Sequence, residues 1–107
     1  MIHVENKRTY RGPGVYVGRP SSLGNPWRVP RGYNHATDPD GVLEKYRAWL
    51  LNRLAEPSSF QSHDMSFLVR AARQGDLVLI CWCAPKRCHA DVIREEIERR
   101  AAAEEGR

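Results

Sequence analysis

Five consecutive apolar residues, Leu77–Cys81, are the feature that most constrains the fold of this chain. A run without polar alternation is typical of a strand covered on both faces, and such strands belong to parallel sheets packed between helices. Residues 84–87 break the run with a proline and two cations, and residues 88–103 then place apolar side chains at helical spacing. A buried strand that leads directly into a helix predicts an α/β fold.

The rest of the chain predicts elements of the same class. Short strands are expected at residues 3–4 and 15–17, followed by a Gly- and Pro-rich loop at 18–27. A helix is expected from the Asp38-Pro39-Asp40 cap to about Pro57, and a shorter one at 64–74 that ends at a glycine. The order predicts a mostly parallel sheet of three or four strands flanked by helices, a small Rossmann-like layer fold.

Length and composition define the class of protein. The chain has 107 residues, so we expect one domain spanning 1–107. Apolar residues are 41% and charged residues 28% of the chain, which is typical of a soluble globular protein. No apolar run approaches the roughly 20 residues of a membrane helix, and the start, MIHVENKR, lacks a signal-peptide core. We therefore expect no membrane association and a cytoplasmic location, and leave the oligomeric state open.

Positive charge is concentrated in the first third of the chain. Residues 1–35 carry six basic side chains and one acid, whereas residues 36–107 carry eleven and twelve. Five of the six cations are arginines, whose planar guanidinium suits bidentate contacts with phosphate. The excess of positive charge indicates one of two things. It could form a face that binds anions, among them weakly bound nucleic acid, or it could be a solvated basic surface.

All three cysteines lie within eight positions, at Cys81, Cys83 and Cys88, and are followed by His89 and Asp91. This cluster falls where the apolar strand ends and the last helix begins, which is where parallel α/β folds bind ligands. Amides at a helix N-terminus favour negative charge, so the thiol of Cys88 is expected to have a lowered pKa.

Four interpretations of the cluster remain open. Cys81, Cys83, Cys88 and His89 make an acceptable ligand set for zinc, and the three thiolates could instead hold an iron–sulfur cluster. In a catalytic pocket, Cys83 or Cys88 would be the reactive thiol, with His89 and Asp91 handling protons. The cysteines could also be ordinary buried residues, or Cys83 and Cys88 could form a reversible disulfide.

The loop at 18–27 contains a second group of candidate residues. Gly18 and Arg19 follow a short strand, and Gly24 and Asn25 make a tight turn before Trp27. Glycine allows a close backbone approach, arginine binds anions, and the asparagine amide both donates and accepts hydrogen bonds. These residues form either a ligand-binding loop or an irregular connection.

Together, the two segments resemble an uncharacterised family of small bacterial and phage proteins. The resemblance depends on VYVGRPSSLGNPW (residues 15–27), on LVLICWCAPKRCHADVI (residues 77–93), and on Tyr46 and Trp49 in the helix between them. It implies that the Gly-Arg and Gly-Asn-Pro loop meets the Cys-His segment at one site. It also implies a bacterial or phage-infected host cell as the setting.

The leading hypothesis is a pocket for a phosphate-bearing small molecule or nucleotide, in which Arg19 binds the anion and Asn25 positions the ligand. The alternatives are a metal-binding module with zinc or an iron–sulfur cluster, and a weak nucleic-acid-binding accessory protein. The residues do not distinguish an enzyme from a binding protein.

Overall fold

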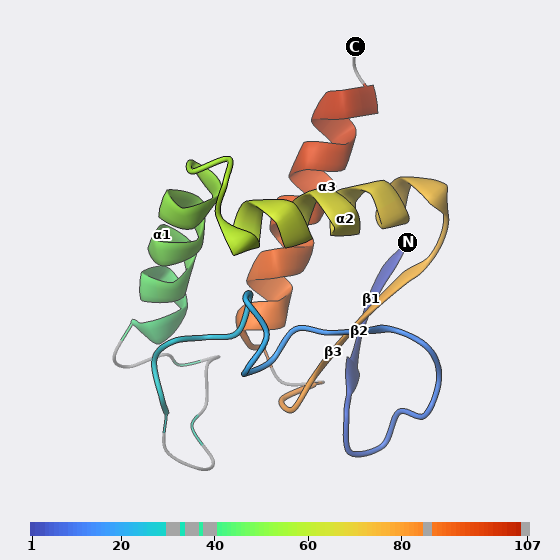
Figure 1. The fold of residues 1–107 in the computed structure, drawn as a ribbon. Coiled ribbons are helices and arrows are strands. Elements are labelled where there is room, and N and C mark those ends of the chain that lie inside the picture. The colour runs from blue at the N-terminus through green and yellow to red at the C-terminus, as the bar shows by residue number, and fades with distance from the viewer. Residues whose placement is uncertain (30–32, 34–36, 38–40, 85–86, 106–107) are drawn as a thin grey trace.

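A computed structural model describes the protein over residues 1–29, 33, 37, 41–84 and 87–105. In chain order, the elements are β1 (Ile2–Asn6), β2 (Val15–Tyr16), α1 (Val42–Leu54), α2 (Phe60–Gln74), β3 (Leu77–Cys81) and α3 (His89–Glu105). Figure 1 shows α2 and α3 crossing above the strands, with α1 at the side. The α/β fold predicted from the sequence is confirmed.

The apolar run forms the central strand of the sheet. The strand order is β1-β3-β2, and both outer strands are parallel to β3. The pairing continues beyond the strand ends, because the amide of Lys7 donates to the carbonyl of Cys81 (2.7 Å) and that of Val17 to Ile80 (3.0 Å). The carboxyl ends of all three strands therefore meet at one edge of the sheet.

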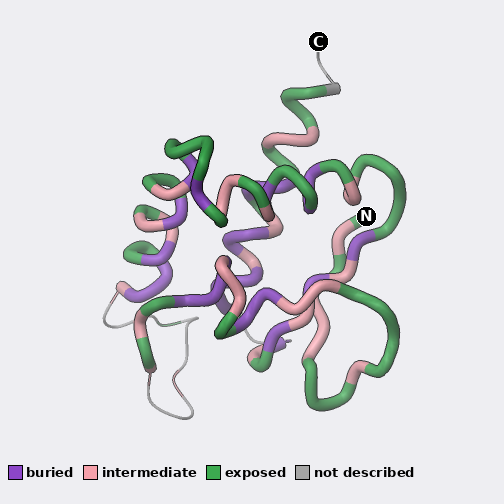
Figure 2. The backbone as a smooth tube through the Cα atoms, viewed as in Figure 1, coloured by how far each residue is buried: buried purple, intermediate pink, exposed green. Residues whose placement is uncertain are grey.

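The two faces of β3 are buried to different degrees. Leu77, Leu79 and Cys81 belong to the core formed with the three helices, whereas Val78 and Ile80 are only half-buried. Figure 2 shows this alternation along the strand. The expectation of full burial on both faces was wrong, because the helices of the described chain share one core on one face of the sheet.

Local sequence explains where α1 begins and where α2 begins and ends, while α1 ends at Leu54, three residues before the expected Pro57. Gly41 precedes α1 in the left-handed region (φ 65°), where glycine is favoured, and the predicted Asp38-Pro39-Asp40 cap lies outside the described residues. The second helix begins at Phe60, four residues earlier than predicted, because the Ser59 hydroxyl accepts a hydrogen bond from the amide of Ser62 (3.0 Å). It ends at Gly75, as predicted.

Ion pairs connect α3 to the other two helices. Arg47 of α1 contacts Glu95 (2.9 Å), and Arg73 of α2 contacts Glu104 (2.8 Å). These pairs are partly exposed, so the apolar core contributes more to holding the helices together. Within the described ranges, no helix combines the length and apolar character needed to cross a membrane.

Candidate functional site

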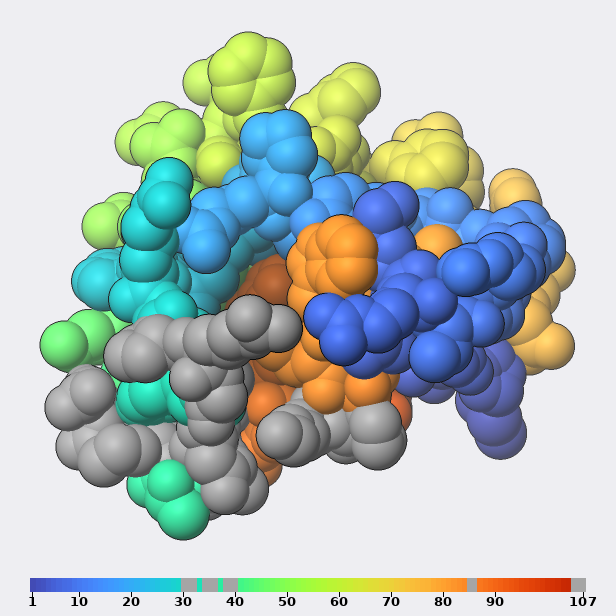
Figure 3. Space-filling model, turned by 90° about the horizontal axis from the view of Figure 1, so that it is seen from below, coloured from blue at the N-terminus to red at the C-terminus, as the bar shows by residue number. Residues whose placement is uncertain are grey.

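A pocket opens at the carboxyl edge of the sheet, between the loop that follows β2 and the turn that connects β3 to α3. We call it the carboxyl-edge pocket. Its volume is about 130 Å³, and its lining residues are Gly18, Arg19, Asn25, Trp27, Val29, Trp82, Cys83 and His89. In Figure 3, the orange surface of the β3–α3 turn lies beside the blue N-terminal segments, with darker atoms of α3 visible in a recess next to it. The pocket brings residues from both candidate segments together.

Two polar side chains in this pocket offer hydrogen-bond donors. The Arg19 side chain is exposed, and its guanidinium makes no hydrogen bond or ion pair with the described part of the chain. Asn25 is only 9% exposed, and its Oδ1 accepts a hydrogen bond from the amide of Trp27 (2.9 Å). Its Nδ2 has no partner among the residues the structure describes, so this nitrogen is the group that Asn25 can offer to a ligand.

The two candidate glycines shape the loop around Arg19. A Cβ on Gly18 would lie 2.5 Å from the Tyr16 hydroxyl, so glycine allows the Tyr16 ring to fold over the backbone. A Cβ on Gly24 would lie 2.9 Å from the Arg19 nitrogen. Gly24 therefore does not line the pocket; it allows the Gly-Asn-Pro turn to pack against the backbone of Arg19.

Helices α1 and α2 fix the position of the same loop. The Tyr46 hydroxyl donates to the carbonyl of Leu23 (2.6 Å), and Gln61 Nε2 donates to the carbonyl of Ser22 (2.9 Å). The Ser22 hydroxyl also donates to the carboxylate of Asp64. Tyr46 is fully buried, and burial raises the pKa of its phenol well above the ordinary value. The sequence had indicated Tyr46 only as part of an apolar helical stripe, so its role as an anchor was missed.

The β3–α3 turn is fixed from the opposite side by β1 and β2. Asn6 Nδ2 donates to the carbonyls of Trp82 (3.1 Å) and Ala84 (2.8 Å). The Trp82 indole donates to the Tyr16 hydroxyl (3.0 Å), which itself donates to the carbonyl of Arg19 (2.7 Å). Asn6 and Tyr16 were not singled out from the sequence; the available signal was a polar residue at the end of each outer strand.

The three cysteines differ in their access to the pocket, and none forms a disulfide. Cys81 and Cys88 are fully buried with their sulfurs 3.5 Å apart, whereas Cys83 is half-buried and lines the pocket. The expectation of a lowered pKa at Cys88 was wrong: hydrogen bonds to Cys81 and Cys83, together with burial, raise the pKa of the Cys88 thiol. The pKa of Cys81 is instead lowered, because its sulfur accepts hydrogen bonds from the Cys88 thiol and from the amides of Cys83 and Ala84.

His89 and Asp91 take different positions at the start of α3. His89 lines the pocket, and its Nε2 donates to the carbonyl of Val17 (2.9 Å) while its ring meets Tyr46 edge-on at 5.4 Å. Asp91 lies outside the carboxyl-edge pocket, and its Oδ2 accepts a hydrogen bond from the amide of Cys88 (2.9 Å). This contact caps the helix, a structural role for the carboxylate.

The side chains considered for metal binding lie near one another, and the metal interpretation stays a prediction. Among the described residues, no group of three or more His, Cys, Asp or Glu side chains could hold a metal ion. Of the four expected ligands, His89 has its Nε2 occupied by a hydrogen bond to the carbonyl of Val17. The geometry therefore gives no support to a zinc or iron–sulfur module.

Comparison with known proteins gives one match. A family model described as a domain of unknown function, DUF4326, matches residues 2–99. No curated protein matches the chain, and no solved structure matches it. The match confirms the predicted membership of an uncharacterised family, while the bacterial or phage origin stays a prediction.

Proposed function

Because the chain belongs to the DUF4326 family, whose description assigns no activity, we propose a function from the site itself: the carboxyl-edge pocket binds the phosphate group of a small molecule or nucleotide. One observation carries the proposal. Gly18, Arg19 and Asn25 from the first segment line the same cavity as Cys83 and His89 from the last.

The polar groups of the pocket suit a phosphate. A guanidinium forms paired, charge-assisted hydrogen bonds with phosphate oxygens, and the unpartnered guanidinium of Arg19 can supply them. Asn25 Nδ2 adds a neutral donor. A ligand that accepts both sets of hydrogen bonds would be held by the loop at two points.

The size and walls of the pocket favour a nucleotide over free phosphate. The volume of about 130 Å³ is below the roughly 300–1,000 Å³ of typical small-molecule pockets, so it suits one end of a larger ligand. Trp27 and Trp82 contribute aromatic surface, and Trp82 is 53% exposed although its indole is held by Tyr16. An exposed aromatic ring in a fixed position is suited to stacking a base that extends beyond the pocket.

Any chemistry on the bound ligand would use Cys83. Of the two thiols considered reactive from the sequence, Cys83 lines the pocket and Cys88 is fully buried. A nucleophile must reach the reacting atom, so Cys88 is excluded from direct attack while its burial persists. The proposal itself concerns binding and requires no reaction.

Isothermal titration tests the proposal with inorganic phosphate, nucleoside mono-, di- and triphosphates, and the unphosphorylated nucleosides. We expect saturable binding of at least one phosphorylated ligand and none of its nucleoside. Arg19→Ala should weaken this binding at least about tenfold, because a hydrogen bond to a charged group contributes about 1.5–3 kcal/mol. The matched control is Arg70→Ala, which removes an exposed arginine from α2 and should leave the affinity unchanged. Equal affinities for the wild type and Arg19→Ala would overturn the proposal.

Weak nucleic-acid binding is the second candidate, and one arrangement favours it. The ammonium of Lys7 lies 5.1 Å from the centre of the Tyr16 ring, and the hydroxyl of that ring holds the exposed Trp82. One tyrosine thus holds a cation and an exposed indole close together. Single-stranded nucleic acid is bound by this combination, a cation for the phosphate backbone and an aromatic ring on which a base stacks. Salt-dependent binding of a single-stranded oligonucleotide, weakened together by Lys7→Gln and Trp82→Ala, would favour this candidate. Oligonucleotide binding that neither substitution changes would remove it.

A further inference from the structure

The three cysteines form a series that runs from the pocket into the core. Cys83 lies in the wall of the carboxyl-edge pocket and is half-buried. The Cys88 thiol donates to the sulfur of Cys81, 3.5 Å away, and Cys83 packs against the core cluster that contains both of these buried cysteines. Cys81 and Cys88 have no exposed surface, so a dissolved oxidant reaches the series only at Cys83.

We propose that Cys83 is an oxidative modification site whose oxidation is passed through Cys88 and stored as a Cys81–Cys88 disulfide beneath the pocket. The oxidant is a hydroperoxide, and the simplest is hydrogen peroxide. This inference does not depend on phosphate binding, because it concerns the sulfurs alone.

The first step takes place at the pocket wall. The Cys83 sulfur attacks one peroxide oxygen, the O–O bond breaks, and the thiol proton passes to the departing hydroxide, which leaves as water. Cys83 is then a sulfenic acid, the first stage of thiol oxidation. The Cys88 sulfur next attacks the Cys83 sulfur, and the sulfenic oxygen leaves as a second water with the proton of Cys88.

Exchange completes the relay. The Cys81 thiolate attacks the Cys88 sulfur, the bond between Cys83 and Cys88 breaks, and Cys83 leaves as a thiolate. Hydrogen bonds from the amides of Cys83 and Ala84 stabilise the attacking thiolate of Cys81 before the exchange. In total, two thiols lose two electrons and two protons, and one peroxide becomes two waters.

The contacts favour Cys81–Cys88 as the final disulfide. Their sulfurs must approach from 3.5 Å to about 2.05 Å, a movement that small side-chain rotations can supply. The bond would link the last residue of β3 to the residue that precedes α3. These two residues already pack against each other in the core. The pairing differs from the Cys83–Cys88 disulfide considered from the sequence, and it returns the pocket-lining thiol to its reduced state.

Mass spectrometry of the peroxide-treated full chain tests this inference. We expect a loss of two mass units from the wild type and one remaining thiol that can be alkylated, which fragmentation should place at Cys83. Trypsin cuts after Arg87, so the disulfide should join the peptide that contains Cys81 to the peptide that begins at Cys88. Three thiols that stay reduced, or a disulfide that joins two chains, would overturn the proposal.

Variants separate the steps of the relay. Cys83→Ser should slow the loss of two mass units at least about tenfold, because the accessible entry thiol is gone. Cys88→Ser should retain a Cys83 sulfenic acid that a dimedone reagent traps, and Cys81→Ser should stop at a Cys83–Cys88 disulfide. If Cys83→Ser is oxidised at the wild-type rate, the relay is wrong. If a core variant does not fold, the mass spectrum of the peroxide-treated wild type still tests the Cys81–Cys88 disulfide.

Discussion

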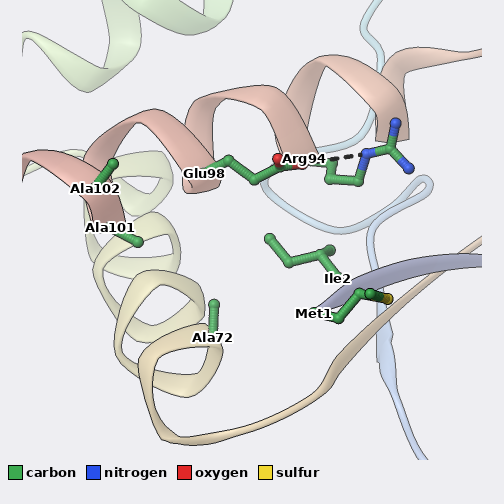
Figure 4. Close-up of a pocket in the computed structure, with 7 residues that line it drawn as sticks. All are labelled: Met1, Ile2, Ala72, Arg94, Glu98, Ala101 and Ala102. Carbon is green, nitrogen blue, oxygen red and sulfur yellow. Dashed lines mark ion pairs between the residues drawn. The ribbon is translucent and has the colours of Figure 1, made fainter.

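Two cavities at different places on this small protein differ in size and in what lines them. The larger one, about 520 Å³, lies between β1, α2 and α3 and is lined by Met1, Ile2, Ala72, Arg94, Glu98, Ala101 and Ala102. Figure 4 shows its two charged side chains, Arg94 and Glu98, joined by a dashed line above the apolar side chains of Met1 and Ile2. The ion pair measures 3.4 Å. The carboxyl-edge pocket has about a quarter of this volume, yet it holds the unpartnered donors of Arg19 and Asn25.

The two cavities thus differ in which parts of the chain form them, because the smaller one draws residues from both candidate segments. In the larger groove Arg94 forms an ion pair with Glu98, although Arg94 Nε makes no hydrogen bond within the described residues, and the other lining residues are apolar. The carboxyl-edge pocket has the exposed guanidinium of Arg19 and the Nδ2 of Asn25, neither of which has a partner in the described chain, and three separate hydrogen-bonded anchors support it: Asn6, Tyr16 and Tyr46. Hydrogen bonds of this kind hold the loop and the turn around the pocket in fixed positions, as a binding site requires.

The largest effect is expected where the carboxyl edge is most tightly packed. Gly18→Ala places a methyl group 2.5 Å from the Tyr16 hydroxyl, so it should destabilise the fold by about 2 kcal/mol and weaken ligand binding. Urea denaturation measures the loss. Gly75→Ala is the control, since a methyl group added there would meet no described atom within 4 Å and its φ of 167° is extended. Equal losses in both variants would contradict the tight packing.

A smaller effect is expected from the anchor beneath the loop. Tyr46→Phe leaves the buried carbonyl of Leu23 without its donor and should cost about 1.5 kcal/mol of stability. Tyr10→Phe removes a hydroxyl that donates to the exposed carbonyl of Pro13 and should cost less. If the two substitutions have the same effect in chemical denaturation, Tyr46 is not a special anchor of the pocket loop.

Asn6→Ala should have the next largest effect. It removes two hydrogen bonds to the β3–α3 turn, but water can replace part of them, so we expect a loss of about 1 kcal/mol. The fluorescence of the exposed Trp82 should also change, because the turn that carries it is loosened. Asn52→Ala, an exposed position in α1, should leave both stability and fluorescence nearly unchanged. If the Asn6 variant is as stable as the wild type, the β3–α3 turn keeps its conformation without the hydrogen bonds from Asn6.

The smallest effect is expected in the larger groove. Glu98→Gln breaks an exposed ion pair with Arg94, and such pairs contribute about 0–1 kcal/mol. Stability should change by less than about 0.5 kcal/mol, and ligand affinity should not change. A clear loss of affinity in titration would make this groove part of the site and would end the comparison.

The features that could be predicted from the sequence are those that depend on local patterns of residues. The apolar run of β3, the helix that follows it and the glycine that ends α2 were confirmed because periodicity and capping are encoded within a few residues. The early start of α2 was missed because Ser59 was not recognised as its cap. Full burial of β3 was wrong, because the side on which helices pack depends on contacts between distant segments.

The candidate site also combines features that were predicted from local sequence with features that depend on contacts between distant segments. Arg19, Asn25, Cys83 and His89 were singled out from the sequence and lie around one cavity. The anchoring roles of Asn6 and Tyr46 were not foreseen, because each depends on a carbonyl far away in the chain. The pKa of Cys88 was predicted in the wrong direction because the helix N-terminus was considered without the sulfur that lies 3.5 Å away.

The central claim is that a phosphate-bearing ligand binds at the carboxyl edge through Arg19, and NMR titration tests it most directly. The side-chain signals of Asn25, Trp27 and Trp82 report on that pocket, and the amides of Ala101 and Ala102 report on the larger groove. With the nucleotide that binds best, we predict saturable shifts of the first set that disappear in Arg19→Ala, while the second set stays unchanged. Shifts confined to Ala101 and Ala102, or shifts that survive Arg19→Ala, would contradict the account.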